Sequence, residues 1–243
     1  MDTFVPYSAL HALAVAVCAL LIAAPALTGR RLHRPAEMRL RRTLAFLAVA
    51  YWLAYNIWWN RHGLDPRTGL PLQLCDINGL IAPLALIARW RWARATLYFW
   101  TAALTVQAFI QPDLAEGPAS PVFWAFWAAH TLIGASAVYD IAVLGFRPRW
   151  DDLGRALAAG LAYVALVAPV NAVLGSDYGF VGHPGPGIAV PPFVLMLGPW
   201  PRRAIVLVGL AACGFVAVLL PWLFAGARPS RARNQAIKAE LSG

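Results

Sequence analysis

The stretch SALHALAVAVCALLIAAPAL (residues 8–27) is followed closely by six arginines, at positions 30, 31, 34, 39, 41 and 42. A helix needs about 20 mostly apolar residues to cross a bilayer, and this stretch has that length. Lys and Arg accumulate in cytoplasmic loops, so we expect a membrane helix that leads into the cytoplasm. The start of the chain has no basic region and no small-residue cleavage site, so we expect this first span to remain in the mature protein.

The same alternation of apolar runs and short charged loops continues along the chain, in which 60% of the residues are apolar and 13% are charged. Such a composition is typical of a polytopic membrane protein. We expect an all-α bundle of seven transmembrane helices, formed as one domain by residues 1–227 and followed by a basic cytoplasmic tail at residues 228–243. The spans are predicted at residues 8–27, 43–59, 71–88, 95–110, 121–144, 154–174 and 203–224.

The positions of the basic residues predict the orientation of this bundle. With seven spans, sixteen of the 20 Lys and Arg residues fall on one side, and only Arg61, Arg67, Arg202 and Arg203 fall on the other. The N-terminus is therefore predicted outside and the C-terminus in the cytoplasm. The net charge of +9 is explained by topology, so we expect no nucleic-acid partner. We predict a multi-pass protein of a cell membrane, the inner membrane of a bacterium.

One long connection interrupts the pattern. Residues 175–201 contain many prolines and glycines and neither Lys nor Arg, so we expect them to form a loop rather than a helix. Arg202 and Arg203 follow this loop. We interpret them as anchors at the membrane interface, with contact to lipid phosphate as the alternative.

The polar stretch LPLQLCDIN (residues 70–78) stands at the predicted start of the third helix. Polar groups in a bilayer need partners and usually have a function. Pro71 suits a first helical turn, and Cys75 would then lie where free N–H groups and the positive end of the helix dipole favour a thiolate. Asp76 opposes this effect, and Asn78 shares the face of Cys75. From spacing alone, Cys75 is either a small inert side chain or a nucleophile.

His130 is the only histidine in the middle of a predicted span, and it ends the aromatic run FWAFWAAH (residues 123–130). Phe126 and Trp127 share its helical face. Such a histidine is a structural hydrogen-bonding group, lines a wet cavity, binds a metal or exchanges protons. We expect it at a depth similar to that of Cys75, where the two could carry out acyl chemistry. The three cysteines form no metal or disulfide pattern.

Four segments together resemble the YwaF-type integral membrane proteins of bacteria. They are LPLQLC (70–75), the run that ends at His130, DYGF (177–180) and LGPWP (197–201). This family is similar to a eukaryotic transmembrane acyltransferase that remodels ether phospholipids, and more distantly to intramembrane threonine hydrolases of fatty-acid esters of hydroxy fatty acids. The resemblance covers about residues 43–222. It implies that Cys75 is an acyl-accepting nucleophile and His130 its partner. The chain departs from the family at Gln73, where histidine is common, and in DYGF, where the family has Asn-Tyr-Met-Phe.

Our hypothesis is therefore an intramembrane acyltransferase or lipid-ester hydrolase that uses a Cys75 thioester and His130 as acid and base. Its partners would be membrane phospholipids, lysophospholipids and fatty-acyl chains, and we expect no cofactor and no metal. The alternatives are a non-enzymatic carrier of a small solute or ion and a structural membrane subunit. Residues expected to bind substrate or stabilise an oxyanion are Asn78, Asp76, Gln73, Asn171, Asp177, Tyr178 and Trp127. Backbone N–H groups near the start of the third helix are the alternative oxyanion donors, and the loop at residues 175–201 would be a lid.

Overall fold

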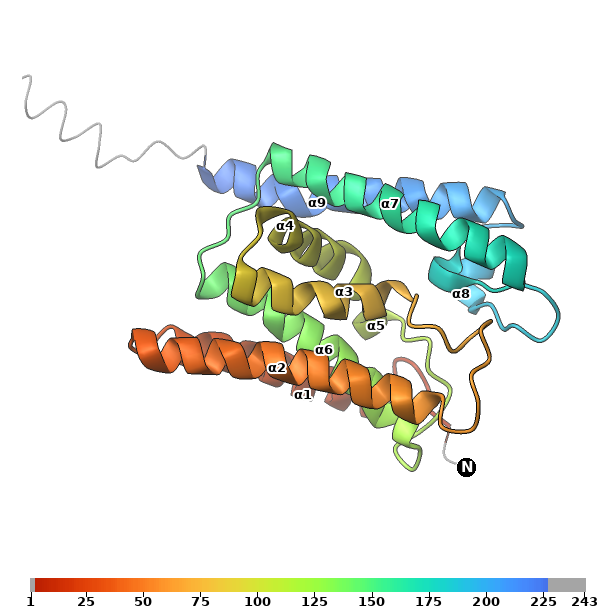
Figure 1. The fold of residues 1–243 in the computed structure, drawn as a ribbon, viewed down its shortest axis with the longest axis horizontal. Coiled ribbons are helices and arrows are strands. Elements are labelled where there is room, and N and C mark those ends of the chain that lie inside the picture. Colours follow the sequence, from red (N-terminus) through yellow and green to blue (C-terminus); the bar gives the residue numbers. More distant parts are fainter. Residues whose placement is uncertain (1–2, 227–243) are drawn as a thin grey trace, which may run out of the picture.

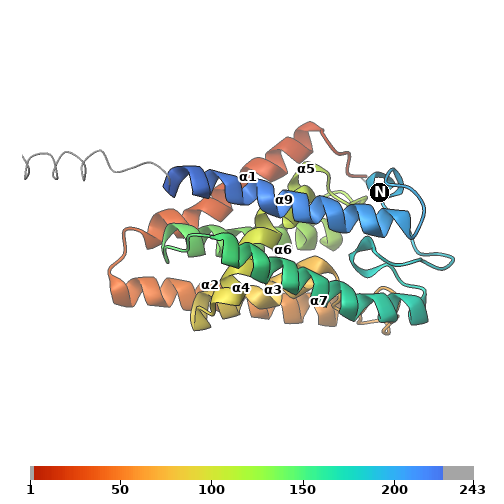
Figure 2. The same cartoon turned by 90° about the horizontal axis from the view of Figure 1, so that it is seen from above.

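The computed structural model describes residues 3–226, which form helices that share one long axis (Figures 1 and 2). The expectation of an all-α protein is confirmed, since the only β pairing within residues 3–226 is an isolated bridge between Thr3 and Glu116. The predicted tail at residues 228–243 lies outside the described residues. The elements are α1 (Ala9–Gly29), α2 (Arg34–Trp59), α3 (Leu74–Pro83), the π-helix η1 (Leu84–Ala88), α4 (Arg91–Trp100), the π-helix η2 (Thr101–Thr105), α5 (Gln107–Ile110), α6 (Pro121–Ala142), α7 (Trp150–Leu174), the 3-10 turn η3 (Tyr178–Phe180), α8 (Pro192–Leu195) and α9 (Arg202–Gly226).

Four of these helices, α1, α6, α7 and α9, are long and apolar enough to cross a membrane. Their outer faces carry large apolar side chains, such as Leu20 and Ile205, each at least 70% exposed. Apolar exposure on that scale marks a surface that something other than water covers, and for long apolar helices lipid is the natural solvent. The chain is therefore a multi-pass membrane protein, while the count of seven spans and their orientation stay predictions.

Helix α4 forms the centre of the bundle. From Ala95 to Trp100 every side chain is buried, because α4 packs against α3 on one side and against α7 and α9 on others. The Tyr98 hydroxyl donates a hydrogen bond to the carbonyl of Val218 in α9 at 2.7 Å. Burial on all sides agrees with the mostly apolar side chains of this segment, in which the hydroxyls of Thr96 and Tyr98 are satisfied by backbone carbonyls.

Several helix boundaries differ from the sequence predictions. Helix α2 begins at Arg34, nine residues before the predicted span, with Pro35 in its first turn, where the missing N–H of proline has no cost. Helix α3 begins at Leu74 rather than near Pro71. The carboxylate of Asp76 accepts the N–H of Gln73 at 3.2 Å and so caps the helix there. The loop at residues 175–201 contains the short elements η3 and α8.

The two ends of the bundle differ in chemistry. We name the end where α3 and α6 begin, together with the loop at residues 175–201, the cysteine end. The opposite end, where α1, η1 and α6 finish and α2, α4 and α7 begin, we name the arginine end. Arginines at 30, 34, 89, 91 and 94 lie in or beside its connections. Figure 1 shows the cysteine end on the right and the arginine end on the left.

Candidate functional site

Cys75 is the second residue of α3, and its half-buried side chain belongs to a small polar cluster. The hydroxyl of Thr105 in η2 lies beside the thiol. The fully buried Asn78 uses its amide N–H groups to donate to Thr101 at 3.1 Å and to Thr105 at 3.3 Å. Threonines at positions i and i+4 share a helix face, and π-helical turns such as η2 frequently occur at functional sites. Sequence reasoning missed both threonines, although their spacing was a usable signal.

The hydrogen bonds of Asn78 change its expected role. Both amide hydrogens are taken by threonines, so Asn78 has no N–H left for an oxyanion, and its Oδ1 is buried without a partner. The N–H groups of Leu74 and Cys75 make no hydrogen bond among residues 3–226. Free N–H groups are normal in the first turn of a helix, and they make this turn the better donor for a developing negative charge.

Tyr163 of α7 holds the chain just before Cys75. Its hydroxyl donates to the carbonyl of Leu72 at 2.8 Å, and its ring packs edge-on against Trp100. The ring also lies against Gly179, whose φ is +68°; a Cβ there would lie 2.6 Å from the Tyr163 hydroxyl. Glycine at position 179 is thus required by both backbone conformation and space. Sequence reasoning did not identify Tyr163, because only the fold brings it to α3.

Tyr178 joins the loop after α7 to the segment that enters α3. Its fully buried side chain donates from the hydroxyl to the carbonyl of Pro66 and accepts the N–H of Leu70, both at 3.0 Å. Burial raises the pKa of the Tyr178 phenol. Beside it, the Gly179 N–H donates to Oε1 of Gln73 at 3.2 Å. The DYGF segment therefore positions the start of α3. The sequence predicted only that the loop containing this segment is a lid, and did not predict this contact.

Asn171 and Asp177 serve this same segment. The Asn171 side chain accepts from the Ser176 hydroxyl and the Tyr178 N–H at 2.9 Å and donates to the Tyr178 carbonyl at 3.0 Å. Asp177 forms an ion pair with Arg203 at 2.9 Å. Burial raises the pKa of the Asp177 carboxyl, and Arg203 opposes that shift. Arg203 is only 4% exposed, so it is a buried partner of the loop rather than an anchor at the membrane interface.

His130 lies in α6 with 8% of its surface exposed. Its Nδ1 is 2.6 Å from the carbonyl of Phe126, so Nδ1 carries a proton when it donates there. Nε2 then has a free lone pair, and it makes no hydrogen bond among residues 3–226. The ring packs against Phe126 and Phe109, with centroid distances of 4.4 and 6.2 Å. A neutral imidazole with this tautomer is suited to accept a proton.

Cys75 and His130 both adjoin the segment from Thr101 to Ile110. Cys75 lies beside Thr105, and His130 packs on Phe109, four residues later and therefore on nearly the same face. Trp127 packs on Phe109, as His130 does, but its other ring contacts are with Phe4 and Phe123 in an aromatic cluster near the N-terminus. Among residues 3–226, no group of three or more His, Cys, Asp or Glu side chains is placed to hold a metal ion.

A family model matches residues 6–220, which include every helix from α1 to α8 and most of α9. The chain belongs to the TMEM164 family. TMEM164 is a family of transmembrane proteins, in agreement with the long apolar helices. The TMEM164 match also covers Cys75, His130 and the Asp177–Arg203 pair. Searches of curated proteins and of solved structures gave no match.

Proposed function

We propose that this TMEM164-family protein transfers or hydrolyses acyl groups of membrane lipids through a thioester on Cys75. The observation that carries the proposal is the setting of this thiol. It lies in the first turn of α3, below two free backbone N–H groups and beside Thr105. Polar groups are rare and functional inside an apolar bundle. The resemblance of LPLQLC and the run ending at His130 to YwaF-type proteins, and through them to a lipid acyltransferase, supports the same assignment.

The first half-reaction acylates the enzyme. Nε2 of His130 takes the thiol proton as Sγ of Cys75 attacks the ester carbonyl of a lipid. The N–H groups of Leu74 and Cys75 donate to the oxyanion of the tetrahedral intermediate. The C–O bond of the ester breaks, and the departing alkoxide takes the proton from His130. The products are a lysolipid and an acyl thioester on Cys75.

The second half-reaction regenerates the thiol. The hydroxyl of a lysolipid, or of water, gives its proton to His130 and attacks the thioester carbonyl. The C–S bond breaks, the thiolate leaves and takes that proton from His130, and a new ester or a free fatty acid is released. Transfer and hydrolysis differ only in the acceptor. The distribution of arginines favours a site in the outer half of a seven-span bundle, and the resemblance to bacterial proteins favours the inner membrane of a bacterium.

Trapping the acyl enzyme tests this proposal. Purified protein in mixed micelles is incubated with a phospholipid that carries a labelled acyl chain, quenched in acid and resolved on a denaturing gel. We expect a label on the protein that neutral hydroxylamine removes, as a thioester requires. Cys75→Ala should abolish the label, whereas Cys213→Ala should retain it, because Cys213 is an exposed residue of α9. Cys18→Ala provides a second control at a buried cysteine.

A label that survives in Cys75→Ala and disappears in Cys18→Ala or Cys213→Ala would disprove the assignment. Absence of any label in the wild-type protein across choline, ethanolamine and glycerol headgroups, with both ester and vinyl-ether lipids, would favour a carrier or structural role instead. Addition of a lysophospholipid separates the two enzymatic outcomes. A transferase converts the label to new phospholipid, and a hydrolase releases it as fatty acid.

A further inference from the structure

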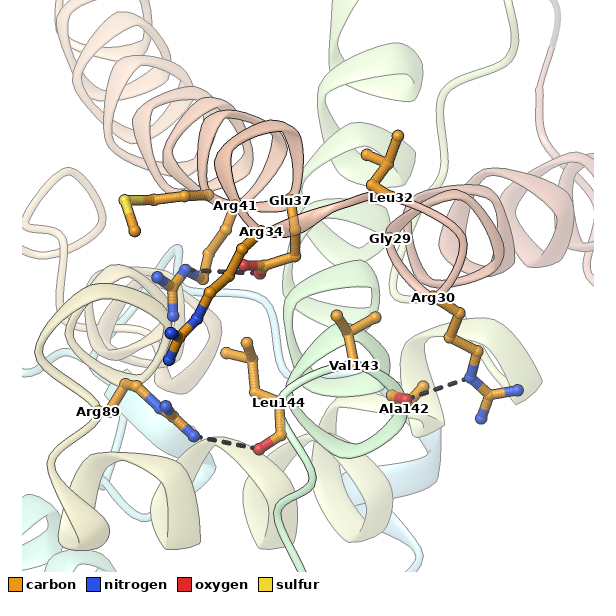
Figure 3. A pocket seen from close by; sticks show the side chains of 11 residues that line it. Gly29, Arg30, Leu32, Arg34, Glu37, Arg41, Arg89, Ala142, Val143 and Leu144 are labelled. Atoms are coloured by element: carbon orange, nitrogen blue, oxygen red, sulfur yellow. Dashed lines mark hydrogen bonds and ion pairs between the residues drawn. The ribbon is translucent and has the colours of Figure 1, made fainter.

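A cavity of about 600 Å³ opens at the arginine end of the bundle (Figure 3). Four parts of the fold meet there: the turn from α1 to α2, the first turns of α2, the end of η1 and the end of α6. The cavity opens to the surface of the protein at this end and is not part of the Cys75 cluster. Its lining residues are Gly29, Arg30, Leu32, Arg34, Glu37, Met38, Arg41, Arg89, Ala142, Val143 and Leu144.

The charge in this cavity is unbalanced, since its walls hold four arginines and one carboxylate. Figure 3 shows Arg34, Arg41 and Arg89 directed into the same space from α2 and from the end of η1. Arg30 lies at the opposite wall, where it donates to the carbonyl of Ala142 at 3.1 Å. Like charges gathered so closely repel one another, and an anion between them would relieve that repulsion.

The single carboxylate, Glu37, pairs with one of these four arginines and leaves the charge of the other three without an acid in the cavity wall. Oε1 of Glu37 accepts from the Tyr139 hydroxyl at 2.9 Å and forms an ion pair with Nε of Arg41 at 3.6 Å, a separation too long for a hydrogen bond. That Nε is buried and has no hydrogen-bond partner. Arg34 makes no ion pair or hydrogen bond with residues 3–226. A buried guanidinium N–H without an acceptor costs free energy, so this wall is incomplete without a ligand that accepts.

Neighbouring arginines at the same end are satisfied differently. Arg91 and Arg94 each bind a buried carboxylate, Asp152 at 2.5 Å and Asp140 at 2.9 Å. Arg89 instead has a φ of +55°, a left-handed conformation that residues other than glycine rarely adopt. In that conformation its side chain lies over the cavity, and its Nη2 donates to the Leu144 carbonyl at 3.2 Å. The protein thus holds Arg89 where no carboxylate meets it.

We propose that this cavity binds a phosphate-bearing anion, the phosphate group of a lipid headgroup or of a soluble phosphate ester. Guanidinium groups bind phosphate oxygens through paired N–H donors, and the cavity is large enough for a phosphate with a glycerol unit attached. The site is separate from the thioester site. Cys75 and Arg89 lie at opposite ends of α3 and η1, roughly 20 Å apart at 1.5 Å per residue.

Lipid binding to the purified, delipidated protein in a neutral detergent tests this inference. Native mass spectrometry or a thermal-shift titration compares short-chain phosphatidic acid with phosphatidylcholine of the same chains. We expect the double variant Arg34→Gln, Arg89→Gln to weaken binding of phosphatidic acid about ten-fold or more. The matched control is Arg39→Gln, Arg42→Gln, which removes the same charge from exposed positions of α2 that do not line the cavity. Its binding should change less than about two-fold.

A second variant keeps every arginine. Glu37→Gln retains an Oε1 for the Tyr139 hydroxyl and removes the only carboxylate, so phosphatidic acid should bind about three-fold tighter or better. This variant does not depend on the bond from Arg89 to Leu144. Equal losses in the cavity and control variants, or no gain in Glu37→Gln, would overturn the proposal.

Inorganic phosphate and glycerol 3-phosphate identify the source of the ligand. Competition with phosphatidic acid at low millimolar concentration, lost in the Arg34→Gln, Arg89→Gln variant, assigns the site to soluble phosphate esters as well as lipids. Competition by lipids alone assigns it to a headgroup. Binding of phosphatidylcholine as tightly as phosphatidic acid, unaffected by the cavity variants, would contradict the site in either form.

Discussion

Polar groups at the cysteine end and at the arginine end of this bundle differ in their partners and in their exposure. At the cysteine end, hydroxyls, amides and backbone groups bind one another. Among residues 3–226 the ion pair at that end is Asp177–Arg203, and each of its two side chains is 5% exposed. At the arginine end, Arg91 and Arg155 remain more than 40% exposed while they bind Asp152, and a cavity of about 600 Å³ holds surplus positive charge.

The two ends are suited to different tasks. Buried bonds at the cysteine end fix the start of α3, because breaking any of them leaves a partner unsatisfied. At the arginine end the Arg94–Asp140 pair is also buried, but the pairs that Arg91 and Arg155 form with Asp152 are half-exposed, so solvent screens them and they contribute less. The first end therefore suits chemistry that needs a fixed geometry, and the second suits exchangeable anions.

The largest effect is expected from His130→Gln, which keeps a side chain able to hydrogen-bond but cannot carry a proton between donor and acceptor. Loss of a general base lowers rates about 10²- to 10⁴-fold. The measurement is acyl transfer from labelled phospholipid at saturating substrate, with unchanged unfolding in detergent. His62→Gln, at an exposed position, is the control. Equal rates in both variants would exclude His130 from the reaction.

The next largest effect concerns the ion pair at the cysteine end. Arg203→Met leaves the Asp177 carboxylate buried without its partner, which should lower the free energy of unfolding by about 3–5 kcal/mol. Arg202→Met, at the adjacent exposed position, should change it by less than about 0.5 kcal/mol. Thermal or denaturant unfolding in detergent measures both. Similar values for the two variants would mean that Asp177–Arg203 does not hold the loop.

A smaller loss is expected from Tyr178→Phe, which removes the hydroxyl between Pro66 and Leu70. The carbonyl and the N–H left behind are partly buried, so we expect destabilisation by about 1–3 kcal/mol. The acyl-transfer rate should fall with it, because the entry to α3 loosens. Tyr7→Phe, at an exposed tyrosine, is the control for loss of a hydroxyl. A Tyr178→Phe protein with unchanged stability and an unchanged rate would show that the Tyr178 hydroxyl does not help to position Cys75.

The smallest effect is expected at the arginine end. Arg155→Gln breaks a half-exposed pair with Asp152, worth about 0.2–1 kcal/mol, and the difference from wild type should shrink as salt is raised. The loss in Arg203→Met should persist in high salt, since that pair is buried. Unfolding at low and high ionic strength compares the two. If the loss in Arg203→Met shrank with salt and the loss in Arg155→Gln did not, the distinction between a buried and a half-exposed pair would be wrong.

Sequence patterns predicted the parts of this protein that depend on neighbouring residues. Apolar runs of span length gave the long helices, although the boundary of α3 moved from Pro71 to Leu74 because the Asp76 cap, which is itself local, was not recognised. Cys75 was singled out by its place in a polar stretch. Tyr163, Thr105 and the partner of Arg203 were missed, because each acts on residues more than 25 positions away in the chain.

The sequence by itself determined an all-α membrane protein whose helices alternate with arginine-rich loops, because hydropathy and charge act on each segment separately. Only the tertiary structure decided that the DYGF segment forms hydrogen bonds with the residues before α3 and that Asp177 forms an ion pair with Arg203. The same is true of Arg89, which the fold brings to the cavity wall formed by Arg34, Glu37 and Arg41 of α2. These contacts are set by how helices pack, and the energy of a hydrogen bond or an ion pair depends on which groups meet and how deeply they are buried.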